Sequence, residues 1–216
     1  MKEIVEQITS DPRYQSNIEY GEPRSGHPEG KVKYHIVELE ENLKKLAAHG
    51  ISEEQYWKLK FLIHVHDTFK ANAIPNEPIV SPNSHASLAK KFASEFIDDE
   101  DLLNMLQFHD VNFALWNQFA ATGSYDVQRF ENLLETIQDW NVFLMFIIID
   151  GSTPGKDPQK LAGFSMKSVN IRIPMLMNHG SYEVQTPPRW RRFDICKVIE
   201  ADYNNVPRRM IAATVK

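Results

Sequence analysis

The sequence predicts an all-α fold with an irregular C-terminal extension. Apolar residues recur every three or four positions through most of the first 150 residues, and helix-capping residues stand in front of these segments. Only residues 171–173 have the pattern of a short strand. With 216 residues, of which 42% are apolar and 25% charged, the chain is long enough for one domain with a substantial core.

The N-terminal elements follow from local signals. A short amphipathic stretch and a Gly/Pro-rich loop precede the first strong helix, which is expected over residues 32–49 because four apolar side chains share one face and Gly50 provides a stop. Ser52, with Gln55 three residues later, predicts a capping box and a second helix that reaches about residue 71.

The later elements are predicted in the same way. Ser81, with Pro82 in the first turn, predicts a helix to about residue 96. Acidic residues from Asp98 onward cap the next helix, and residues 111–119 continue it or form its kinked successor. The apolar spacing over residues 126–149 predicts the longest helix of the chain, and a last helix is expected from Trp190 to about Tyr203.

Several functional classes are excluded by composition. The single cysteine, Cys196, rules out an internal disulfide framework and an all-cysteine zinc site. No secretory signal is recognisable, and the most apolar stretch, Trp140–Ile149, is about half the length of a membrane span. We therefore expect a cytoplasmic protein without a membrane partner.

The net charge of −5 is unevenly distributed. From Pro187 onward, seven Lys/Arg residues face three Asp/Glu residues, so the tail carries +4 and the remainder −9. Three arginines around Trp190 could meet a nucleic acid or a phosphorylated ligand, but a solvated helix start is the preferred interpretation. The acidic remainder argues against a general nucleic-acid binder.

Ionisable side chains occur where the sequence otherwise predicts buried helix. Four histidines and two aspartates are placed in this way: His35, His66, Asp67, His85, His109 and Asp150. A lone charge at such a position would be costly, whereas imidazole and carboxylate groups together are ligands for Mn, Fe, Co, Ni or Zn. The set is large enough for one or two divalent ions. His64, two positions before His66, is expected to face away from it.

Other residues near this set are candidates for ligand contact. Lys70 lies four residues after His66, where a cation suggests a phosphate or carboxylate ligand or, alternatively, meets the last carbonyls of its helix. Glu29 could hydrogen-bond a ligand, although capping of the first helix is preferred. Arg24 could contact phosphate or be an exposed loop residue, and Asp110 is expected beside a metal-binding histidine or in solvent rather than as a ligand.

The ordered set resembles a known family. His35, the His66–Asp67 pair and Asp150, in this order on an all-α core, resemble the HD superfamily of metal-dependent phosphohydrolases over roughly residues 27–152. His85 and His109 are similar to the two extra histidines of its two-metal members.

Two local motifs extend the resemblance. Residues 66–70 are similar to the HD-x-x-K form of many members, and residues 27–30 followed by His35 resemble the start of the HD domain of bacterial CCA-adding tRNA nucleotidyltransferases. The HD pair alone is a weak signal, because residues 109–110 repeat it.

The resemblance implies an HD-domain helical bundle over residues 27–152, preceded by an N-terminal helix and loop (1–26) and followed by an extension that packs on the core (153–216). One metal ion would take its ligands from His35, His66, Asp67 and Asp150. The second would take His85 and His109, with Asp67 bridging. The implied activity is hydrolysis of a small phosphomonoester or phosphodiester, plausibly a nucleotide, by a metal-activated water, with Asp67 and Lys70 as the catalytic residues.

Alternatives remain open at this stage. The Gly-Tyr-Pro motif of the cyclic-di-GMP phosphodiesterases is absent, so that substrate is not expected. The same ligand set also serves HD-fold mixed-valent di-iron oxygenases of the myo-inositol oxygenase type, and ligands alone do not identify the metal. A third alternative is a regulatory binding module that is held together by metal. The role of residues 153–216 is also open, and a homodimer contact is one of the options.

Overall fold

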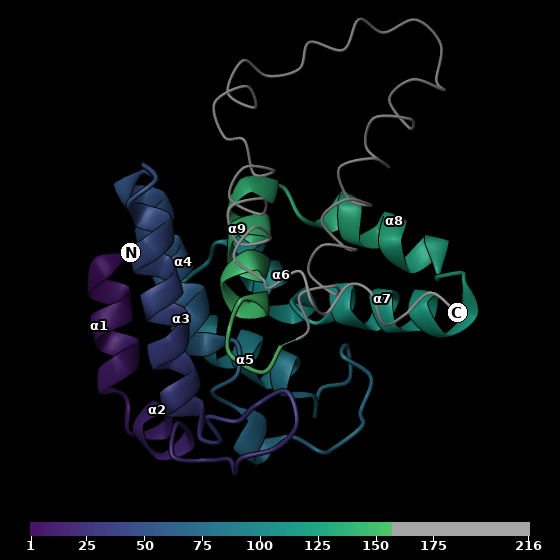
Figure 1. Ribbon diagram of the computed structural model, residues 1–216. Coiled ribbons are helices and arrows are strands. Elements are labelled where there is room, and N and C mark those ends of the chain that lie inside the picture. The colour runs from purple at the N-terminus through teal and green to yellow at the C-terminus, as the bar shows by residue number, and fades with distance from the viewer. Residues whose placement is uncertain (157–216) are drawn as a thin grey trace, which may run out of the picture. The chain divides into compact units, whose positions relative to one another are not determined.

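The computed structural model describes residues 1–156, which form helices joined by loops, with no strand among them (Figure 1). The all-α prediction is therefore confirmed for this part of the chain. The helices are α1 (Lys2–Ser10), α2 (Pro12–Asn17), α3 (Val32–Ala47), α4 (Glu53–Val65), α5 (His85–Ala93), α6 (Glu100–Phe108), α7 (Val111–Thr122), α8 (Val127–Thr136) and α9 (Trp140–Gly151). A short 3-10 turn, Lys70–Asn72, lies between α4 and α5.

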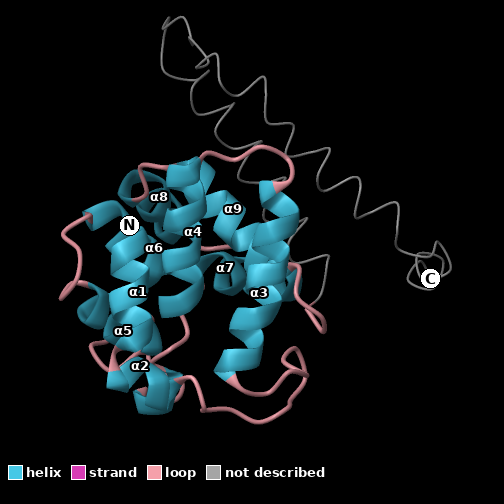
Figure 2. Ribbon diagram, turned by 90° about the vertical axis from the view of Figure 1, so that its left-hand side faces the viewer, coloured by secondary structure: helices cyan, strands magenta, loops and turns pink. Residues whose placement is uncertain are grey.

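Helix α4 is the central element. It packs against α1, α3, α6 and α9, and α1 covers it on the side that faces the viewer in Figure 2. Consistent with this position, the side chains of Leu59, Phe61, Leu62 and Ile63 are fully buried. The C-terminal half of α4 is therefore enclosed by its neighbours, as is typical of a helix segment in a protein core, and the residues that follow α4 extend from this buried segment.

Helix α4 begins as predicted and ends earlier than predicted. The side chain of Ser52 accepts a hydrogen bond from the amide of Gln55 in a complete capping box. The predicted extension to residue 71 is wrong, because the helix ends at Val65. The amide of Thr68 donates to the carbonyl of Val65 at 3.2 Å and the amide of Lys70 donates to the carbonyl of Asp67 at 3.1 Å. These three-residue hydrogen bonds tighten the chain into 3-10 turns.

Helix α5 begins three residues later than the sequence suggested. Residues 81–84 form a turn in which the amide of Ser84 donates to the carbonyl of Ser81. Ser84 is the N-cap, and its hydroxyl accepts from the amide of Ser87 at 3.1 Å. His85 is therefore the first residue of the helix and does not lie one turn inside it.

The single long helix expected over residues 126–149 is wrong. The structure has two helices, α8 and α9, with a bend of 119° between them. Asp139 starts α9 by accepting hydrogen bonds from the amides of Asn141 and Val142. The carboxylate of Asp101 on α6 accepts from the amides of Gln138 and Asp139 at 2.8 and 2.7 Å. Backbone groups exposed by the break are thus satisfied.

Some predictions fall outside the described residues. The strand at 171–173, the helix at 190–203 and the basic cluster around Trp190 all lie there, as does most of the predicted extension. Within residues 1–156, no single helix is both long and apolar enough to cross a membrane.

Candidate metal centre

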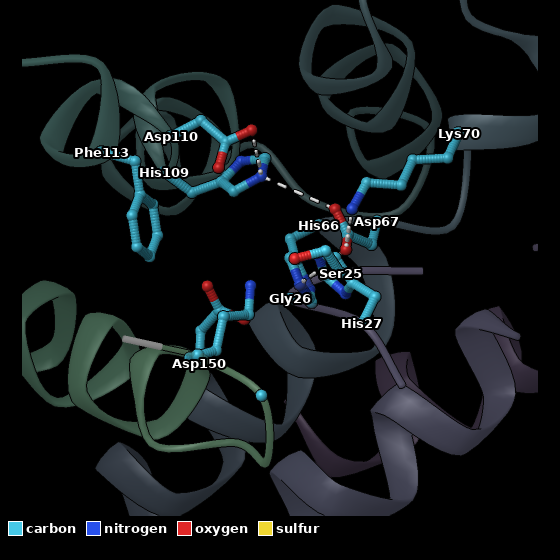
Figure 3. Close-up of a pocket in the computed structure, with 12 residues that line it drawn as sticks. Ser25, Gly26, His27, His66, Asp67, Lys70, His109, Asp110, Phe113 and Asp150 are labelled. Atoms are coloured by element: carbon cyan, nitrogen blue, oxygen red, sulfur yellow. Dashed lines mark hydrogen bonds and ion pairs between the residues drawn. The ribbon is translucent and has the colours of Figure 1, made fainter. Parts of the chain in front are cut away.

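The structure brings the six predicted ligands into one region. They come from α3, the end of α4, the first residue of α5, the end of α6 and the end of α9, so five separate segments contribute. Figure 3 shows His66, Asp67, His109 and Asp150 around a common space. Five of the six residues are buried, and His85 is half-buried.

Asp67 lies between two pairs of histidines. Its Oδ2 atom is 3.5 Å from Nε2 of His66 and 4.0 Å from Nε2 of His35. Its Oδ1 atom is 3.9 Å from Nε2 of His85 and 3.8 Å from Nε2 of His109. Atoms that bind one ion at about 2.0–2.2 Å lie roughly 3–4 Å apart. Each group could therefore hold a metal ion, with Asp67 common to both.

Hydrogen bonds fix the orientation of two of these imidazoles. Nδ1 of His66 lies 3.1 Å from the carbonyl of Ile63, and Nδ1 of His109 lies 2.8 Å from the carbonyl of Leu106. A carbonyl can only accept, so the proton of the neutral ring is on Nδ1 and the lone pair is on Nε2. Nε2 of His66 is buried without a hydrogen-bond partner. This is the arrangement of histidines that bind metal.

His35 is held between two carboxylates. Its Nε2 atom is 3.1 Å from Oδ1 of Asp150, within hydrogen-bond distance. Its Nδ1 atom is 3.2 Å from Oε1 of Glu29, an ion-pair distance without the angles of a hydrogen bond. The same oxygen of Glu29 is 2.9 Å from Nδ1 of His27. The preference for Glu29 as a helix cap is wrong, because the N-cap of α3 is Lys31 and no side chain caps it. Glu29 instead lies behind His35, and its Oε2 atom is buried without a partner.

Asp110 is closer to the centre than expected. Its Oδ2 atom lies 3.2 Å from Nε2 of His85 and 3.6 Å from Nε2 of His109, so it approaches the nitrogen atoms that face Asp67. Carboxylates that orient a metal-binding histidine contact its other nitrogen. Asp110 could therefore be a further ligand, and the preference against this role does not match its position.

The other histidines contact different partners. As predicted, His64 faces away from the centre, with Nδ1 2.6 Å from the hydroxyl of Tyr14 and Nε2 2.9 Å from Oε1 of Glu40. His27, which was not among the predicted site residues, lines the cavity at the centre.

The electrostatics favour a neutral imidazole at His66, an ionised carboxylate at Asp67 and a positive charge at His109. Burial lowers the pKa of His66 to about 4, so this imidazole is neutral near pH 7. Burial raises the pKa of Asp67, but the charges of Lys70 and His66 outweigh it and hold this pKa well below its usual range. Burial also lowers the pKa of His109, but Asp110 and Asp67 outweigh it and raise this pKa to about 9. The carboxylates thus favour positive charge at this position.

A cavity of about 440 Å³ opens at the centre, a size in the lower part of the range for small-molecule sites. Lys70 lies at one side of it, with Nζ 2.5 Å from Oδ2 of Asp67 (Figure 3). Arg24 does not line this cavity, since its side chain is exposed and its backbone pairs with that of His27. The cavity is lined by Ser25, Gly26, His27, His66, Asp67, Lys70, His109, Asp110, Phe113, Asp150, Gly155 and Lys156.

Phe113 and Lys156 line the cavity, and neither was among the predicted site residues. The only sequence signal for Lys156 was its place six residues after Asp150. Comparison of the chain with known protein families, curated proteins and solved structures found no match.

Proposed function

We propose that this protein is a metal-dependent phosphohydrolase of the HD type, acting on a small, nucleotide-like phosphate ester. The observation that carries the proposal is the position of Asp67, whose two carboxylate oxygens each face a different pair of histidines. Pairs of ions that share a carboxylate in this way are common in phosphatases and nucleases.

In this proposal, one ion would be held by His35, His66, Asp67 and Asp150, and a second would be held by His85, His109 and Asp67. The donor set fits, because imidazole and carboxylate groups suit Mn, Fe, Co, Ni and Zn alike. When bound, such ions act as Lewis acids and lower the pKa of water.

Lys70 would bind the phosphate. Its ammonium group is held by Asp67 at the cavity, and its side chain is only 23% exposed. Burial lowers the pKa of Lys70, but the charge of Asp67 outweighs it and raises this pKa, so the group is a cation near pH 7. An ammonium group has three donors, and those not used by Asp67 are available to phosphate oxygens.

Elemental analysis of protein purified without chelator tests this proposal, together with a screen of phosphate esters. We expect about two equivalents of Mn, Co, Ni, Zn or Fe in the wild type, about one in His85→Ala, and loss of both in Asp67→Asn. Hydrolysis should fall by roughly 100-fold or more in both variants, because even residues behind metal ligands change activity by 10–100-fold. His49→Ala and Asp98→Asn are matched controls, since both side chains are exposed.

The outcomes separate the competing functions. Unchanged metal content and hydrolysis in Asp67→Asn would refute the proposal. Two equivalents of iron with a mixed-valent electron paramagnetic resonance signal and oxygen uptake would favour the di-iron oxygenase alternative. Intact metal binding without turnover on any ester would favour a regulatory binding module.

A further inference from the structure

Lys156 is a second cation at the cavity, and it has no role in the proposed function. Its side chain is 16% exposed, and its Nζ atom is 3.7 Å from Oδ1 of Asp150. It also lies 5.4 Å from the centre of the Phe113 ring, within the range of a cation–π interaction. Lys156 therefore lines the cavity between an aromatic face and a candidate metal ligand.

The backbone around Lys156 is held firmly. The amide of Lys156 donates to the carbonyl of Thr153 at 3.2 Å, and the hydroxyl of Thr153 donates to the carbonyl of Asp150 at 3.1 Å. Gly155 has a φ of +85°, and a Cβ atom there would lie 2.7 Å from Cδ of Pro28. The turn after α9 thus packs against the loop that carries His27, and this contact directs Lys156 to the cavity.

The charge of Lys156 is incompletely satisfied. Among the described residues, its ammonium group forms no hydrogen bond, and its one ion pair is longer than hydrogen-bond distance. The facing oxygen of Asp150 also lies 3.1 Å from Nε2 of His35, and the proposed function uses it for metal binding. In contrast, Nζ of Lys70 is only 2.5 Å from Oδ2 of Asp67. Lys156 is therefore free to bind an anion that enters the cavity.

We propose that Lys156, together with Lys70, selects a dianionic phosphoryl group, so that the substrate is a phosphomonoester and not a phosphodiester. This inference rests on the proposed function and specifies its substrate. Three carboxylates line the cavity and would repel an anion, which makes each cation there important. Attraction to a cation scales with the charge of the ligand. A phosphomonoester carries nearly two negative charges at pH 7 and a diester only one, so Lys156 stabilises the monoester more.

The two cations also lie beside different carboxylates of the centre, Lys70 beside Asp67 and Lys156 beside Asp150. Figure 3 shows these carboxylates on separate sides of the cavity. A terminal phosphoryl group has three unsubstituted oxygens and can meet cations from both sides. A diester has two, and its second ester group would compete for the same small cavity.

The test measures charge preference in the full-length, metal-loaded protein. For Lys156→Gln, kcat/KM for p-nitrophenyl phosphate should fall at least tenfold, and kcat/KM for bis(p-nitrophenyl) phosphate should fall less than threefold. The affinity for inorganic phosphate, measured by calorimetry, should also fall about tenfold. Lys156→Arg should restore most of the monoester preference, because it restores the charge. Lys91→Gln, at an exposed position on α5, should behave as the wild type.

The controls keep the two proposals separable. Metal content and the thermal unfolding midpoint of each variant show whether the centre and the fold are intact, and Lys156→Met is a second neutral variant if Lys156→Gln is unstable. Equal losses for both esters, or unchanged phosphate affinity, would overturn the role of Lys156. If the wild type hydrolyses neither these two esters nor any ester of the wider screen, the proposed function fails. In that case, a tenfold loss of phosphate affinity in Lys156→Gln would still support Lys156 as an anion-binding residue. Unchanged phosphate affinity would overturn that role as well.

Discussion

Replacing Glu29 by glutamine should weaken metal binding in one half of the centre and leave the other half unchanged. Oε1 of Glu29 contacts Nδ1 of His35 at 3.2 Å and Nδ1 of His27 at 2.9 Å. A carboxylate at Nδ1 keeps the proton there and leaves Nε2 as the metal ligand. Glutamine has nearly the same size and retains one acceptor oxygen, but it loses the charge that favours this tautomer.

The size of the effect follows from the geometry. Residues that orient a metal-binding histidine typically change metal affinity by 10–100-fold. Charge-assisted hydrogen bonds are about 2.7–2.9 Å long, whereas Glu29 and Nδ1 of His35 are 3.2 Å apart and lack the angles of a hydrogen bond. We therefore expect the lower end of the range, about tenfold in Kd, or ~1.4 kcal/mol.

Competition with a chromophoric chelator measures the two metal affinities separately. Glu29→Gln should weaken one of them by about tenfold and leave the other within error of the wild type. Glu22→Gln is the matched control, because Glu22 is an exposed carboxylate of the same loop. If Glu29→Gln weakened both metal affinities equally, or changed neither, the argument that Glu29 acts through His35 alone would be refuted.

Two further predictions concern stability. His64 and Lys60 outweigh burial and lower the pKa of Glu40 to about 2. The contribution of Glu40 to the free energy of unfolding is therefore fully present above the ordinary pKa of a glutamate and is lost as the pH falls below about 4.5 toward 2. The free energy of unfolding in urea should therefore fall between pH 6 and pH 3 in the wild type. After discounting for solvent screening, this fall should be about 1 kcal/mol larger in the wild type than in Glu40→Gln. The control Glu41→Gln, at an exposed position, should show the same fall as the wild type. Asp101→Ala removes the acceptor for two backbone amides between α8 and α9 and should lower the free energy of unfolding by roughly 1–3 kcal/mol; an unchanged urea midpoint would show that these amides are satisfied without it.

The candidate metal-binding residues could be predicted from sequence because they violate a strong pattern. Asp150 follows an apolar segment, and His66 ends another. Each is therefore an ionisable group at a position that is expected to be buried, where it is tolerated only if it is paired with another group or binds a metal ion. The side chains of both residues proved to be buried at one centre. His64 was separable from this set because its two-residue offset from His66 directs it to another side of the helix.

Features that depend on tertiary contacts were not predictable. The apolar spacing continues through Ile137, which is buried, so nothing in the pattern marks the break between α8 and α9. The break is stabilised by Asp101, which lies 37 residues away from Gln138 in the chain. Lys156 is another example, because its place at the cavity depends on packing of Gly155 against Pro28.

The end of α4 explains how the His66–Asp67 pair comes to lie between the two groups of candidate metal ligands. Within a continuous helix, adjacent side chains point about 100° apart, which would direct the two residues to different regions. The helix instead ends at Val65, and the amides of Thr68 and Lys70 hydrogen-bond to carbonyls three positions earlier. This turn places Asp67 among four imidazole Nε2 atoms and returns Lys70 to its carboxylate. Because the turn extends from a helix that packs against α1, α3, α6 and α9, changes in the core around α4 should alter metal binding as well as stability.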